Sequence, residues 1–156
     1  MSPWLLAPVV LQMLAMLLDE FVFHRARGLP RWERIGHPLD TLSAALCYGW
    51  LVVVPPTTPH ALGVYIGLCA FSCLLITKDE FVHARLCEPR EAWLHAVLFV
   101  LHPLVFLAFG LIWTSADRAW LLQTELLLTL GFAAYQLGYW TLWRPRWSKN
   151  LRNSPV

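Results

Sequence analysis

The four residues Asp-Glu-Phe-Val occur twice in this chain, and a histidine follows each copy. The first copy is 19–22, with His24 two residues later, and the second is 79–82, with His83 directly after it. Each copy lies at the end of an apolar run, where ionisable side chains beside a bilayer are costly and tend to be functional. Imidazole and carboxylate groups together bind iron, zinc or manganese. The repeated motif therefore indicates a metal site.

A second histidine follows each motif at the start of the next apolar run. His37 and His95 come after short basic segments that contain Pro-Arg. The connecting loops are only about a dozen residues long, so we expect these histidines at the same end of the helices as the motifs. Each repeat then supplies one glutamate and two histidines, the ligand set of non-haem iron centres. Two such sets that face each other predict a dinuclear site.

The spacing within each motif selects the predicted ligands. Residues three or four positions apart share one face of a helix, which pairs Glu20 with His24 and Glu80 with His83. Phe23 acts as a one-residue insertion in the first copy. A pairing by equal spacing instead matches Glu20 and His24 with Asp79 and His83, and both registers stay open. The predicted metal ligands are Glu20, His24, His37, Glu80, His83 and His95.

A second tier of polar residues surrounds these six, able to ligate or to orient the histidine rings. Structural roles are open as well. Glu33 and Glu91 lie near predicted helix starts, where acidic residues interact favourably with the helix dipole. His102 precedes a proline and can hydrogen-bond a carbonyl freed by a kink. The second tier comprises Asp19, Glu33, Asp40, Asp79, Glu91 and His102.

Five apolar runs carry this polar set. The chain has 156 residues, of which 58% are hydrophobic and 14% charged, less charge than soluble domains usually carry. A membrane-spanning helix needs about 20 apolar residues, and a soluble helical bundle is disfavoured because the runs lack a polar stripe of helical period. The runs cover residues 3–18, 39–54, 61–77, 92–115 and 119–143.

Basic residues alternate along the chain and orient the predicted spans. Segments 25–36, 78–90 and 144–156 are rich in Arg or Lys, whereas 55–60 has neither and the loop near Arg118 has one. Positive residues favour the cytoplasmic side, so the N-terminus is predicted outside and the C-terminus in the cytoplasm of a bacterial-type inner (plasma) membrane. Since the basic residues are juxtamembrane, no nucleic-acid partner is expected.

These observations predict an all-α integral membrane protein with a single transmembrane domain, residues 1–156. Two parallel two-helix repeats, about 3–54 and about 61–115, form a four-helix bundle. The fifth transmembrane helix, about 119–143, packs against the bundle, and 144–156 form a cytoplasmic tail.

The ligand inventory favours a di-iron centre with two iron ions per chain, with zinc or manganese as alternatives. The ligand chemistry is similar to that of ferritin-like di-iron bundles. The predicted activity is that of an O2-dependent oxidoreductase (an oxidase, hydroxylase or desaturase) acting on a lipophilic substrate or quinone from the surrounding membrane lipid. Glu20 and Glu80 would bridge or bind terminally, and the four histidines would be terminal ligands.

Two other functions stay open. A haem-binding or electron-transfer protein would use paired histidines as axial ligands, but haem iron needs no carboxylate. A non-catalytic zinc or iron sensor or transporter is the other alternative. Thiolate sites are disfavoured because the chain has no Cys-x-x-Cys, and only Cys87 lies near the motifs.

Overall fold

The chain is helical in the computed structural model, which describes residues 3–115 and 119–143 and shows no strand in those ranges. The all-α prediction is therefore confirmed. The predicted tail 144–156 and the basic Arg118 lie outside the described residues.

Each predicted apolar run forms one helical segment. The first and third change helix type near the Asp-Glu-Phe-Val motifs, and the fifth changes near its end. In chain order the segments are η1 (Pro3–Leu6), α1 (Ala7–Leu18), η2 (Asp19–His24) and α2 (Arg25–Arg27); α3 (Arg31–Val53); α4 (Ala61–Leu75), η3 (Ile76–Asp79) and α5 (Glu80–Leu86); α6 (Pro89–Trp113); and α7 (Ala119–Gln136) with η5 (Leu137–Trp143).

Three of the five segments are long and apolar enough to cross a membrane: Trp4–Arg27, Ala61–Leu86 and Pro89–Trp113. These three are consistent with a membrane protein. The α3 and α7–η5 segments are of similar length, but polar side chains interrupt their apolar character. For these two, the prediction of membrane spans stays a prediction.

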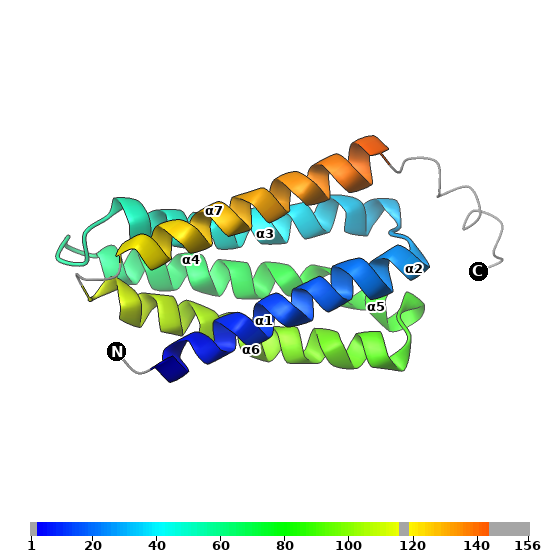
Figure 1. The fold of residues 1–156 in the computed structure, drawn as a ribbon, viewed down its shortest axis with the longest axis horizontal. Helices are drawn as coiled ribbons and strands as arrows, with labels where there is room; N and C mark the ends of the chain where they lie inside the picture. Colours follow the sequence, from blue (N-terminus) through cyan, green and yellow to red (C-terminus); the bar gives the residue numbers. More distant parts are fainter. Residues whose placement is uncertain (1–2, 116–118, 144–156) are drawn as a thin grey trace.

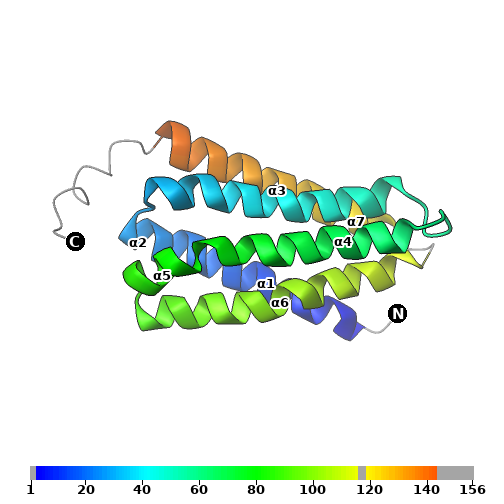
Figure 2. The same cartoon turned by 180° about the vertical axis from the view of Figure 1, so that it is seen from behind.

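The five segments lie side by side and alternate in direction (Figures 1 and 2). α3 packs against α7 and α4, and α1 packs against α6. The short connections after α2 and α5 lie at one end, which we call the motif end, and the 54–60 loop lies at the other (Figure 1). Both Asp-Glu-Phe-Val copies therefore lie at the same end of the molecule.

The apolar core fills the half away from the motif end. Tyr65 donates a hydrogen bond of 2.7 Å to the Phe106 carbonyl, and a Cβ on Gly110 would meet the Tyr65 ring at 3.0 Å, so α4 and α6 approach closely here. The outward faces are apolar as well: Leu46, Leu74 and Leu107 are each more than half exposed. Contiguous exposed apolar surface suits a membrane environment better than water.

Candidate metal centre

Four histidine rings from four helical segments meet at the motif end. The ring centroids of His24 and His37 are 4.5 Å apart, and those of His83 and His95 are 4.2 Å apart. Both remaining neighbouring pairs, His24 with His95 and His37 with His83, are 6.2 Å apart. The rings thus form a four-sided arrangement with opposite sides of nearly equal length, which we call the histidine rectangle. Exchange of the first repeat for the second leaves these side lengths almost unchanged. The two repeats are related here by an approximate two-fold axis.

Several nitrogen atoms of these rings have no hydrogen-bond partner among the described residues, although they are buried. They are Nε2 of His37, both ring nitrogens of His83, Nδ1 of His95, and Nε2 of His24, which lies 3.2 Å from Asp19 Oδ2 without forming a hydrogen bond. A buried polar atom without a partner costs about 1–3 kcal/mol, so native structures leave few of them. Imidazole nitrogens without a protein partner are potential ligands for a metal ion.

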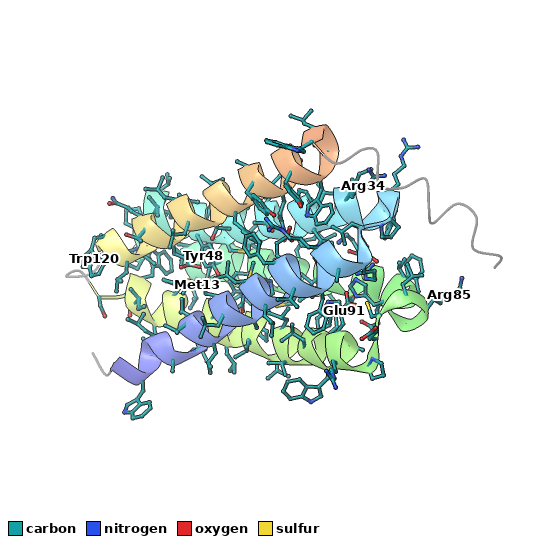
Figure 3. All side chains as sticks on the ribbon, turned by 45° about the vertical axis from the view of Figure 1, so that its right-hand side comes forward. Met13, Arg34, Tyr48, Arg85, Glu91 and Trp120 are labelled. Carbon is teal, nitrogen blue, oxygen red and sulfur yellow. The ribbon has the colours of Figure 1, made fainter. Side chains whose placement is uncertain are left out.

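Arg27 lies where the two repeats meet, between two buried glutamates. Its Nη2 is 2.8 Å from Glu33 Oε2 and 2.8 Å from Glu91 Oε1. Glu33 Oε1 is 3.9 Å from His83 Nε2, and Glu91 Oε1 is 3.9 Å from His24 Nε2. Equal distances on the two sides extend the approximate two-fold symmetry from the histidines to these carboxylates. Figure 3 labels Glu91 on α6, where α6 starts at this end.

A π-helical turn, η2, shapes the first copy of the motif. π-helical turns form hydrogen bonds between residues five apart, one more than in an α-helix, and often mark functional sites. This turn buries Asp19, Glu20 and His24 together, and so absorbs the insertion predicted at Phe23. Asp19 Oδ1 is 3.1 Å from His95 Nε2, and its Oδ2 is 3.2 Å from His24 Nε2.

Glu20 is held on both of its oxygen atoms. Its Oε2 is 3.5 Å from His24 Nδ1, and its Oε1 accepts a hydrogen bond of 2.6 Å from Trp140 Nε1 of η5. The fifth segment therefore contributes to the site. The sequence signal for Trp140 is its position about one turn before the predicted end of the fifth apolar run.

The second copy of the motif has a different helical phase from the first. Its glutamate, the predicted ligand Glu80, does not face the site. Glu80 is exposed, whereas Asp79 and His83 are buried. A 3-10 turn, η3, precedes α5 without an inserted residue, so the side chain four positions before the histidine faces inward. This matches Asp79 with Glu20, the register of equal spacing.

Lys78 forms ion pairs with two of the second-tier carboxylates. Its Nζ lies 2.6 Å from Asp40 Oδ2 and 2.9 Å from Asp79 Oδ2. α3 approaches this ion pair closely, because a Cβ on Gly36 would meet Asp79 Oδ2 at 2.7 Å. Asp40 and Asp79 thus form a separate pair of carboxylates around an ammonium group, beside the histidine rectangle.

His102 lies deeper in the molecule than the rectangle. Its Nε2 is 3.0 Å from Ser72 Oγ, and its Nδ1 is 3.4 Å from Gln12 Nε2. Both ring nitrogens are therefore engaged with protein groups, which favours its role as a hydrogen-bonding residue over that of a ligand.

Cys87 joins the site from the short connection between α5 and α6. Its sulfur lies within 4.8 Å of a ring nitrogen of His83 and of His95. Burial raises the pKa of the Cys87 thiol to about 12, so the thiol is protonated at neutral pH unless a metal ion displaces the proton.

The potential ligand atoms follow the four sides of the rectangle. Four groups have all their ligand atoms within 4.8 Å of one another: Glu20, His24 and His37; Asp19, His24, Glu91 and His95; Glu33, His37 and His83; and His83, Cys87 and His95. Each group contains two adjacent histidines, and Glu80 occurs in none of them among the described residues. Opposite sides share no histidine, so ions at two opposite sides would have no histidine ligand in common.

Sequence reasoning missed Arg27 and underrated Glu33 and Glu91. Arg27 counted only as one of the basic loop residues, because the predicted helix ended before it. Its position three residues after His24, on the same helical face, was the available signal.

Comparison with known proteins adds no functional assignment: no protein-family model, curated protein or solved structure matches this chain.

Proposed function

We propose that this chain is a membrane-embedded metalloprotein that binds two metal ions, preferably iron, in the histidine rectangle. The observation that carries the proposal is the approximate two-fold set of four histidines with unpartnered buried nitrogens. One ion would be held by His24 and His95 with Asp19 and Glu91, and the other by His37 and His83 with Glu33. Glu20 lies at the short side between His24 and His37.

The charge of the site supports cation binding. Asp19, Glu20, Glu33 and Glu91 are all buried, and Arg27 is the cation that contacts two of them. Several uncompensated carboxylates in a low-dielectric interior carry a high desolvation cost. Divalent ions bound by neutral histidines would offset this negative charge, and the mixed nitrogen and oxygen donors suit iron.

The proposed setting is a membrane crossed by all five segments, with the motif end at the cytoplasmic face. The three strongly apolar segments carry His24, His83 and His95, while α3 carries His37 and η5 carries Trp140. A centre of two irons there would act as an O2-dependent oxidoreductase on a lipophilic substrate. Iron supplies the redox chemistry when bound, while the protein positions the imidazoles and keeps the carboxylates out of water.

Metal analysis tests this proposal directly. The full chain, purified in mild detergent without added metal, is expected to contain about two irons per chain. His24→Asn and His83→Asn should each lower the metal content, whereas His60→Asn should not, since His60 lies at the opposite end. Equal metal content in all three variants would refute the site.

One observation favours a second function. Cys87, His83 and His95 form a mixed sulfur and nitrogen group, and such donors suit zinc. One zinc per chain, lost in Cys87→Ser, would support a structural or sensory zinc site instead. A strong Soret band would support the haem alternative.

A further inference from the structure

A cavity of about 570 Å³ leads from the proposed metal centre into the apolar half of the molecule. Its wall on α1 and η2 runs from Val9 to His24, and its wall on α7 runs from Glu125 to Gln136. At the helical rise of about 1.5 Å per residue, the first wall is roughly 22 Å long. Figure 3 labels Met13 on α1 and Tyr48 on α3, which both line this cavity.

The cavity opens to the lateral surface of the molecule between α1 and α7. α1 packs on α6 and α7 packs on α3, so the two helices border the opening. The apolar rim residues Met13, Leu17 and Leu128 are 46%, 39% and 59% exposed. In a bilayer this rim faces acyl chains, and a lipophilic molecule can enter sideways without crossing water.

Gln12, His102 and Glu125 line the same cavity farther along, but most ionisable groups of its lining lie at its motif end. Glu20, His24 and His37 line it there, at the end of the helices where a membrane would meet its head groups. A volume of about 570 Å³, divided by the wall length of roughly 22 Å, gives a mean cross-sectional area of roughly 25 Å². This area fits one extended hydrocarbon chain.

We propose that this cavity binds a single-chain amphiphile, with its polar head at the metal centre and its tail between α1 and α7. This inference rests on the proposed function, because it makes the amphiphile the substrate of the metal centre. Fatty acyl and isoprenoid chains share the required chemistry, an apolar chain one molecule wide with one polar end.

Photolabelling tests the binding mode in the full chain in phospholipid nanodiscs. The probes are two palmitic acids, one with a diazirine near the carboxyl group and one with a diazirine near the methyl end. The first should label Tyr135 and the second Glu125, because both residues line the cavity and lie about 15 Å apart along α7. A farnesyl-chain diazirine that labels better than either palmitate would identify the isoprenoid source.

Gly131 provides the blocking variant and Gly67 its matched control. A Cβ at either glycine meets nothing within 4 Å, but only Gly131 lines the cavity. Gly131→Phe should lower labelling of Tyr135 and Glu125 at least about tenfold, since a phenyl ring occupies part of the chain's path. Gly67→Phe should leave the labelling unchanged, and both variants should keep the metal.

The outcomes separate the two proposals. Labelling spread evenly over lipid-facing side chains, and insensitive to Gly131→Phe, overturns the cavity inference even when two irons are present. The expected labelling on a protein that binds no metal supports the amphiphile site and overturns the metal centre and the substrate role.

Discussion

Glu20→Gln and Glu80→Gln apply the same substitution to the same position of two identical four-residue motifs. The structure predicts opposite results. Glu20 is 2% exposed and lies within reach of His24 and His37, whereas Glu80 is exposed and outside the ligand groups. Glutamine keeps the shape of glutamate and removes only the charge, so packing changes little in either variant.

The magnitude follows from the contacts of Glu20. Its carboxylate accepts a hydrogen bond of 2.6 Å from Trp140 and lies 3.5 Å from His24 Nδ1. Loss of even an outer contact to a metal-binding histidine lowers metal affinity about 10- to 100-fold, which is about 1.4–2.8 kcal/mol. Glu20→Gln should reach at least this range. Glu80→Gln should change the affinity less than about twofold, as expected of a surface site.

Competition with a chromophoric chelator, together with elemental analysis, measures both affinities on detergent-purified protein. Equal losses of metal affinity in the two variants would mean that both glutamates face the site. The inferred difference in helical phase between η2 and η3 would then be wrong. Unchanged affinity in Glu20→Gln would remove Glu20 from the site.

Two further predictions concern Arg27 and Cys87. Arg27→Met leaves two buried glutamates without their cation, which should destabilise the metal-free protein by about 3–5 kcal/mol. Added metal should recover part of this loss of stability because it neutralises the same carboxylates. Thermal unfolding with and without chelator measures the difference. An equal loss in both conditions would argue against metal near these glutamates. The raised pKa of the Cys87 thiol, about 12, leaves about one thiolate in 10,000 at about pH 8, so alkylation of metal-free protein should be slow and should rise about tenfold per pH unit up to that pKa. Peptide mass spectrometry follows the modification, and a rate typical of an exposed cysteine would contradict the burial.

The apolar runs and the repeated motif were enough to predict the helices and the meeting of the four histidines. Apolar run length determines where helices form, and the alternation of basic loops places both motifs at one end. His24, His37, His83 and His95 follow from these two features without any knowledge of side-chain packing.

The carboxylates could not be predicted in the same way, because the choice between neighbours depends on helical phase. Asp79 and Glu80 differ by one position, about 100° around a helix, and a single inserted residue decides which one faces inward. Glu33 and Glu91 are compatible with ordinary helix starts. Their shared contact with Arg27 and their approach to His83 and His24 show that they belong to the site.

The inserted residue also makes the two halves of the centre chemically unequal. Counting back five residues from the motif histidine reaches Asp19 in the first copy and Lys78 in the second. Asp19 contacts His24 and His95, whereas Lys78 turns to Asp40 and Asp79. One half therefore adds a carboxylate to its histidine pair, while the other has an ammonium group at the equivalent position. Although the histidines obey the two-fold symmetry closely, the electrostatic attraction for a cation is stronger in the half that contains Asp19, and a first metal ion would bind there.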